Sequence, residues 1–255
     1  MSDLYSLQGK IYSAVRNSTT GQRGELTWMG NASVATLAIA VEKSDKNESF
    51  SGARGLYGSL ITAKNGTVNM TLDEFTVENL ALALHSTQVA VAAGTVTAET
   101  LPDALVAGDE VQLDQRFISD LVLTDSTSVT PVTLVEGTHY EVISAAGGVI
   151  KILDVATLTQ PFKAAYAHAA ADSLAIFAQA TPPERWIYFD GINTVTGEKV
   201  LIDLYRVQFD PVTDFGLINE DWGGLQLTGN LLVDPINLNN SNLGGYGRLM
   251  KSKAA

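Results

Sequence analysis

The segment Thr67–Ser86 changes from a strand pattern to a helix pattern within a few residues. Apolar Val68, Met70 and Leu72 alternate with polar neighbours, which is typical of a strand with one buried face. The residues that follow have the spacing of a short amphipathic helix. The apolar stripe predicted for this helix is Val77, Leu80, Ala81 and Leu84.

The start of this helix carries its own local signals. We expect Thr76 to be the N-cap and Phe75 to pack against Leu80 as a hydrophobic staple. Glu78 lies near the positive end of the helix dipole, and Asn79 falls off the apolar stripe. Because almost every other patterned segment predicts a strand, the sequence indicates a mainly β fold, a β-sandwich or half-barrel, with one flanking α-helix.

Composition excludes several classes of site and of protein. The chain has 255 residues and no cysteine, which rules out disulfides, thiolate metal sites and a cysteine nucleophile. Its formal net charge of −12 argues against sequence-independent binding of nucleic acid, which needs clustered Lys and Arg. No secretory leader pattern and no apolar run of membrane-spanning length occurs, so we expect a soluble chain made in a cytoplasm, without membrane insertion.

The acidity is concentrated in one region, which predicts a domain boundary. Residues 90–172 hold eleven acidic and three basic side chains, a net charge of −8, and four short strand patterns: GDEVQL, ISDLVLTD, HYEVIS and GVIKILD. We therefore expect an inserted, small β-sandwich-like domain at 90–172. A discontinuous core domain would comprise residues 1–89 and 173–255, with the acidic insertion on its outer surface.

The core domain is expected to contain further strands. The patterns predict a strand within 25–41, strands on both sides of a hairpin turn at Thr194–Gly197, and a final half-buried strand through Leu225–Val233. Residues 4–15 predict an N-terminal arm or short strand. The Asn- and Gly-rich tail from Asn237 onward is expected to be mobile.

The segment Glu42–Asn65 predicts a long connection rich in Ser, Gly and charge. Connections longer than about 12–15 residues are usually functional or disordered. This one contains apolar side chains, including Ile61, that a solvated linker does not need, and its mixed charge suits a docking arm that fixes register on a neighbouring subunit. The alternative is a solvated surface loop. The predicted docking residues are Glu42, Lys43, Asp45, Lys46, Glu48, Phe50, Arg54, Leu56, Tyr57 and Lys64.

No catalytic or metal-binding constellation stands out. His85, His139 and His168 are far apart and fit no metal-ligand spacing, so we expect ordinary surface or turn histidines. No nucleophile-elbow motif occurs. An acidic group that could offer oxygen ligands lacks the calcium-loop pattern, so a solvated strand edge is expected there: Asp109, Glu110 and Asp114. We predict no cofactor, no metal and no enzymatic activity.

Two segments carry a family resemblance. TVNMTLDEFTVENLALAL, from Thr67, and YRVQFDPVTDFGLINEDWGGLQLTGNLLVDP, from Tyr205, resemble the strand–turn–helix and closing strands of the major tail tube proteins of long-tailed, non-contractile bacteriophages. The resemblance covers the core on both sides of the insertion, which is not typical of the minimal family.

The resemblance implies a virion structural protein and a set of partners. Such proteins form hexameric rings whose sheets join into a continuous inner β-barrel. The rings stack into a tube through the long loop, and the helix lies on the outer side of the sheet. The implied partners are further copies of the chain and the tape-measure, tail-tip and tail-terminator proteins. DNA passes through the lumen without sequence-specific binding.

Two other classes of protein remain open at this point. A β-rich surface module that binds carbohydrate would need paired exposed aromatic side chains, and glycan binding by the monomer would favour it. The candidates for that role are Trp186, Tyr188, Trp222 and Tyr246. A related tube subunit of a secretion or contractile system is the other alternative, and a gene neighbourhood with tape-measure and tail-terminator genes would distinguish it.

Overall fold

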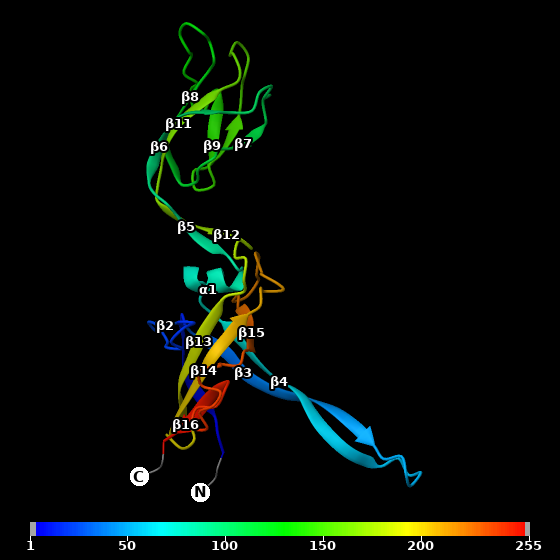
Figure 1. The fold of residues 1–255 in the computed structure, drawn as a ribbon. Helices are drawn as coiled ribbons and strands as arrows, with labels where there is room; N and C mark the ends of the chain where they lie inside the picture. The colour runs from blue at the N-terminus through cyan, green and yellow to red at the C-terminus, as the bar shows by residue number, and fades with distance from the viewer. Residues whose placement is uncertain (1–3, 253–255) are drawn as a thin grey trace. The chain divides into compact units, whose positions relative to one another are not determined.

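The fold is mainly β with one helix, as the sequence predicts, in a computed structural model that describes residues 4–252 (Figure 1). The chain divides into two compact units. Unit 1 combines the residues up to Gln88 with those from Leu174 onward, and unit 2 is Val89–Ser173. The predicted insertion, residues 90–172, falls within unit 2.

Unit 1 is built on a large sheet with the strand order β2-β1-β13-β14-β15-β4-β3, in which β16 also pairs with β14. All of these pairings are antiparallel. The strands are β1 (Leu7–Ala14), β2 (Thr27–Trp28), β3 (Ala32–Asn47), β4 (Leu56–Leu72), β13 (Glu184–Asn193), β14 (Lys199–Phe209), β15 (Leu225–Leu231) and β16 (Gly247–Lys251). The predicted hairpin turn joins β13 to β14, with Gly197 at φ 75°.

The main core of unit 1 lies on one face of this sheet, and a smaller cluster of Ala14, Trp186 and Tyr205 lies on the other. Val68, Met70 and Leu72 of β4 are buried in the main core, as their alternation predicts, together with Leu225 and Leu227 of β15. The helix α1 (Val77–Ala83) adds its own side chains to the same cluster. The sheet and the helix therefore share one apolar core, which is the arrangement that a half-buried strand followed by a short amphipathic helix requires.

The helix buries a different stripe from the one predicted. Its buried residues are Asn79, Leu82 and Ala83, whereas all four residues of the predicted stripe are only half-buried. Asn79 can occupy the core because its Nδ2 donates to Met29 O at 2.8 Å and to Glu74 O at 3.2 Å. A buried amide with two partners looks like a surface residue to any hydropathy pattern, and the predicted phase of the helix was wrong for that reason.

The start of the helix follows the prediction at its cap. Thr76 is the N-cap, and its Oγ1 accepts a hydrogen bond from Asn79 N at 3.2 Å. Phe75 was expected to staple against Leu80; its ring lies 5.9 Å from the ring of Phe215, in the β14–β15 connection.

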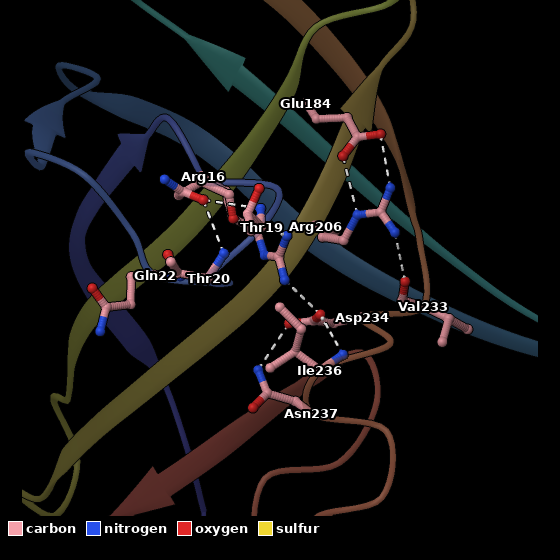
Figure 2. A network of polar contacts seen from close by, with 11 residues as sticks. Arg16, Thr19, Thr20, Gln22, Glu184, Arg206, Val233, Asp234, Ile236 and Asn237 are labelled. Carbon is pink, nitrogen blue, oxygen red and sulfur yellow. Dashed lines mark hydrogen bonds and ion pairs between the residues drawn. The ribbon is translucent and has the colours of Figure 1, made fainter.

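The two ends of the chain are tied into the sheet. Residues 7–14 form β1, between β2 and β13, so the N-terminal segment is a strand and not an arm. The tail was expected to be mobile, and this was wrong: β16 pairs with β14, and Tyr205 Oη donates to Leu243 O at 2.9 Å. Figure 2 shows two of the polar contacts that hold the segment before this strand, where Arg16 donates to Asp234 and Arg206 donates to Val233 O. Arg206 also donates to Glu184 of β13. Such ion pairs join residues far apart in the sequence, so the local composition of the tail could not predict them.

Unit 2 consists of two three-stranded antiparallel sheets, β7-β10-β9 and β6-β11-β8, with a core of their own. The strands are β6 (Gly94–Thr100), β7 (Glu110–Gln112), β8 (Ile118–Thr124), β9 (Tyr140–Ser144), β10 (Val149–Ile152) and β11 (Lys163–His168). Four of these match the strand patterns seen in the sequence. The chain passes between the units through β5 (Thr87–Val91) and β12 (Ala171–Ala175), which pair with each other.

Candidate assembly surface

The most prominent surface feature of unit 1 is the hairpin of β3 and β4. These two strands pair along almost their whole length, from Ala32 opposite Leu72 to Asn47 opposite Leu56. The other side of β4 pairs with β15 only through Thr67–Leu72. Beyond that point the hairpin continues as a two-stranded ribbon (Figure 1), which we call the arm and define as Glu42–Asn65.

The arm is therefore not the irregular connection that its composition suggested. Within Glu42–Asn65, only residues 48–55 lie outside the two strands. The prediction failed because all but Ala63 of the arm's strand residues, Glu42–Asn47 and Leu56–Asn65, are exposed. A ribbon with water on both sides has no buried face, so its sequence lacks the alternation that identifies a strand.

The turn at the end of the arm is organised by one carboxylate. Glu48 accepts hydrogen bonds from Phe50 N at 2.9 Å, from Ser51 N at 2.8 Å and from Ser51 Oγ. These bonds, led by the one from the Ser51 hydroxyl, lower the pKa of Glu48 to about 2. Glu48 therefore shapes the arm itself. Nearby, the rings of Phe50 and Tyr57 meet edge to face at 6.2 Å.

The strand register sorts the predicted docking residues onto two faces of the arm. On one face Val41 lies opposite Lys64 and Lys43 lies opposite Ile61. This face continues the core face of the sheet, because Leu37 lies opposite the buried Val68 in the same alternation. We call it the inner face of the arm, and we include in it Ile39 and Val41, which directly precede the arm on β3. The opposite, outer face carries the predicted docking residues Glu42 and Lys46.

The sheet of unit 1 ends in open edges. β3, with 16 residues, is an edge strand whose one neighbour among the described strands is β4. At the other edge, the two residues of β2 pair only with Tyr12 and Ser13 of β1. A cavity of about 880 Å³ lies over the core face and is lined from both edges, by Leu7 and Ile11 of β1 and by Ala35 of β3 among others. Long unprotected edges are templates for pairing with another chain.

A second apolar surface lies in the connection between β14 and β15. Its side chains Leu217, Ile218 and Trp222 are 83%, 95% and 98% exposed. The base of the connection is fixed, since Val212 N donates to Ala83 O at 2.9 Å and Phe215 packs against the core. We call residues 216–223 the apolar loop. Sequence reasoning noted this segment only as part of a resemblance; the available signal was its three large apolar residues among Asp214, Glu220 and Asp221.

The aromatic residues proposed for carbohydrate binding have separate structural roles. Trp186 and Tyr188 come together under Arg23, whose guanidinium carbon lies 5.8 Å and 5.7 Å from their ring centroids. Trp186 is buried against Tyr205. Of the other two candidates, Trp222 belongs to the apolar loop, and Tyr246 Oη donates to Lys64 O at 3.3 Å.

The histidines do not form a site. His85 was expected on the surface or in a turn; it follows α1 at φ 47° but is buried, with Nε2 at 3.0 Å from Phe209 O. His139 Nδ1 accepts from Val135 N at 2.8 Å, and His168 Nδ1 lies 3.4 Å from Ala169 O. In residues 4–252, no group of three or more His, Asp or Glu side chains is arranged to hold a metal ion.

The acidic residues considered as calcium ligands are used locally or are solvated. Asp109 Oδ2 accepts from Val106 N at 2.9 Å, Glu110 is an exposed residue of β7, and the backbone N–H of Asp114 donates to Glu99 at 2.9 Å. Within the described part of the chain, no helix has the length and apolar character needed to span a bilayer.

The chain matches a known family, but the description of that family names no activity. A family model described as "Protein of unknown function UCP028589" matches residues 4–250, and the chain belongs to this family. No curated protein matches the chain. Any functional conclusion therefore comes from the edges, the arm and the apolar loop.

Proposed function

We propose that this member of a family of unknown function is a virion structural protein, the subunit of a bacteriophage tail tube. In this proposal the chain forms rings, hexameric as the resemblance implies, and the rings stack into the tube of a long, non-contractile tail. The tube conducts DNA during infection, and the chain has a structural and not a catalytic role. Its location is the virion tail.

The observation that carries the proposal is the 16-residue edge strand β3. Its backbone donors and acceptors on the free side need a partner, and a strand from a second copy supplies one without any new side-chain chemistry. Adding the same contact around an axis closes a ring and removes the open edges. The partly uncovered β1 at the other end of the sheet is the edge that such a copy would present.

The face of the sheet opposite the core supports the tube more than it supports a binding site. Thr36, Asn69 and Thr228 lie in one row across β3, β4 and β15, and Thr228 Oγ1 donates to Asn69 Oδ1 at 3.0 Å. The flanking cross-strand pair of Thr67 with Asn230 is also uncharged. Charged groups stand beside this row: Asn230 Nδ2 donates to Asp210 at 2.8 Å, and Glu184 pairs with Arg206. A row with few charges lets DNA pass without binding its phosphates, in line with a transient and sequence-independent passage.

The remaining parts of the chain have places in the same proposal. The arm contacts the next ring, and the acidic unit 2 decorates the outer surface, where repulsion from DNA has no consequence for the lumen. The tape-measure protein fills the lumen before infection, and the tail-tip and tail-terminator proteins close the two ends of the tube. These partners are part of the tail-tube proposal.

Electron microscopy of the purified full-length chain, with and without a tail-tip initiator, tests the proposal. Stacked rings with a central lumen are the expected result. A monodisperse monomer under all conditions, initiator included, would contradict it. Neighbouring genes for tape-measure and tail-terminator proteins would separate a phage tail from a related secretion-system tube.

A further inference from the structure

We propose that the apolar loop of one copy docks on the inner face of the arm of a second copy. This inference rests on the proposed tube function and names the two surfaces that meet when copies stack. It is carried by the match between these surfaces in apolar character, in charge and in placement along the sheet.

The apolar loop is built to present its side chains. Leu217, Ile218 and Trp222 are almost fully exposed, whereas both ends of the connection are held against the core. A large aromatic side chain on a fixed base loses little conformational entropy when it is buried, which is why Trp dominates many interfaces. The loop also carries Glu220 and Asp221, so its apolar tip has a negative rim.

The inner face of the arm offers the complementary surface. Ile39, Val41 and Ile61 are exposed on it, with Ile39 at 77%, although no core lies beneath them. Lys43 and Lys64 lie opposite Ile61 and Val41, so cationic and apolar side chains alternate across the two strands. Such a surface accepts apolar side chains between positive charges.

The other charges of the arm strengthen this match. The arm has four cations and three carboxylates. Two of these carboxylates are engaged within the arm: Glu42 accepts from Asn65 Nδ2 at 2.9 Å on the outer face, and Glu48 holds the turn. Asp45 is the remaining carboxylate, one step beyond Lys43 on the inner face. The middle of the inner face is thus positive where the apolar loop is negative.

The placement of the two surfaces requires a second copy. The apolar loop precedes Leu225, which lies opposite Leu72 at the far end of β4, whereas Lys64 lies eight residues earlier on that strand. At about 3.3 Å per residue, these two points of the sheet are roughly 26 Å apart. The arm and the loop of one chain therefore lie toward opposite ends of β4. A contact between opposite ends of identical copies is head-to-tail, and it repeats along a stack.

Charge reversal of the full-length chain tests the contact. Lys43→Glu with Lys64→Glu, and separately Glu220→Lys with Asp221→Lys, should each raise the protein concentration needed for assembly by roughly tenfold or more, because two attractive pairs become repulsive. The chain with all four changes should assemble close to the wild-type concentration. Ser44→Glu, on the outer face of the same strand and outside the predicted docking residues, is the control and should change little.

The outcomes separate this inference from the proposed function. Suppose that the wild type forms tubes. If either reversed pair then assembles normally, if the chain with all four changes is not rescued, or if Ser44→Glu is as harmful as the inner-face changes, the docking assignment is wrong while the tube remains. If the wild type never assembles, the proposed function itself fails. Unchanged thermal unfolding of each variant shows that the fold is intact.

Cross-linking gives a second readout that does not depend on polymer yield. The chain has no cysteine, so single substitutions introduce the only thiols. On oxidation, a mixture of a Val41→Cys chain and an Ile218→Cys chain should form a disulfide-linked heterodimer. A Ser44→Cys chain, changed on the outer face, should not link to the Ile218→Cys chain. Equal linking of both arm positions, or of neither, would overturn the proposed contact.

Discussion

Asp203, Asp234 and Asn79 are buried polar residues that fasten segments far apart in the chain. Asp203 contacts Arg23 at 3.3 Å and Arg248 at 3.0 Å, which ties the N-terminal and C-terminal segments to β14. Each of the three side chains has its partners, so burial of its polar atoms is compensated. Removing the partner of a buried polar group leaves that group without compensation, so substitutions in these sets have a measurable effect on stability.

Asn79→Ala should destabilise unit 1 although it removes a polar residue from an apolar core. The substitution leaves the carbonyl groups of Met29 and Glu74 without their amide donor, and we expect a loss of about 1–3 kcal/mol in the free energy of unfolding. Denaturant unfolding of the full-length chain measures it. Glu78→Ala, at the exposed neighbouring position, is the control and should change stability by less. An unchanged or raised stability for Asn79→Ala would mean that these two hydrogen bonds are not formed.

Asp125 makes the stability of unit 2 depend on pH. Its buried carboxylate accepts hydrogen bonds from Thr127 Oγ1 at 2.6 Å and from the backbone N–H groups of Val132 at 2.6 Å and Thr159 at 3.2 Å. These bonds, led by the one from the Thr127 hydroxyl, lower its pKa from 3.8 to about 2. Because the folded-state pKa is depressed, the stabilisation is complete above about pH 5 and is lost as pH falls through 3.8 toward 2.

The comparison of wild type with Asp125→Asn isolates this contribution. We expect a clear difference in unfolding midpoint at pH 7 that narrows as the pH falls below 4, because the wild-type carboxyl then becomes protonated. Thermal unfolding of the two proteins at several pH values measures the difference. Glu136→Gln, at an exposed carboxylate of the same unit, should show no such trend. A constant difference at all pH values would contradict the role assigned to the ionised carboxylate.

At the scale of elements, the arm is held mainly by the pairing of its own two strands. The ribbon of Glu42–Asn65 has backbone pairing between β3 and β4 but no described third strand beside it. An isolated two-stranded hairpin is marginally stable in water, so a ribbon of this length is most stable when a partner covers it. We therefore expect the arm to be covered by a partner in an assembly.

Shortening the arm should separate folding from assembly. Glu42 and Ala63 are cross-strand partners. Replacing residues 43–62 with Asn-Gly therefore joins them by a two-residue hairpin turn, for which Asn-Gly is a favoured sequence. The core of unit 1 loses none of its buried residues, so thermal unfolding should be nearly unchanged. Stacked tubes should be absent in electron micrographs. Normal tubes from the shortened chain would show that the arm is not a docking element.

Strand segments with one buried face could be predicted, whereas the exposed ribbon of the arm could not. The alternation of Val68, Met70 and Leu72 located the C-terminal end of β4, and Thr76 located the start of the helix, because burial and capping leave marks on nearby residues. The arm left no such mark, since both of its faces are exposed. The C-terminal strand β16 was missed because its position depends on pairing with β14 and on ion pairs such as Arg248 with Asp203, which join residues far apart in sequence.

At the scale of the whole molecule, the chain combines two units with separate cores. Buried apolar residues of unit 2, such as Phe162, Ile150 and Leu123, form one cluster, and those of the large sheet form others. Eleven of the chain's acidic residues fall within 90–172, so the charge as well as the core is partitioned. The surfaces assigned to assembly, the arm and the apolar loop, both belong to unit 1.

Removing unit 2 should therefore leave assembly intact. Residues 92–170 are replaced by a flexible Gly/Ser linker, which keeps β5 and β12 as a paired exit and entry for the chain. Because the core of unit 1 uses none of the removed residues, the shortened chain should unfold cooperatively and form tubes whose outer diameter is smaller and whose lumen is unchanged. Electron microscopy of both tubes measures the two diameters. A wider lumen would place unit 2 inside the tube and contradict the outer position proposed for it. Loss of assembly in a chain that still folds would instead make unit 2 part of the contact between subunits.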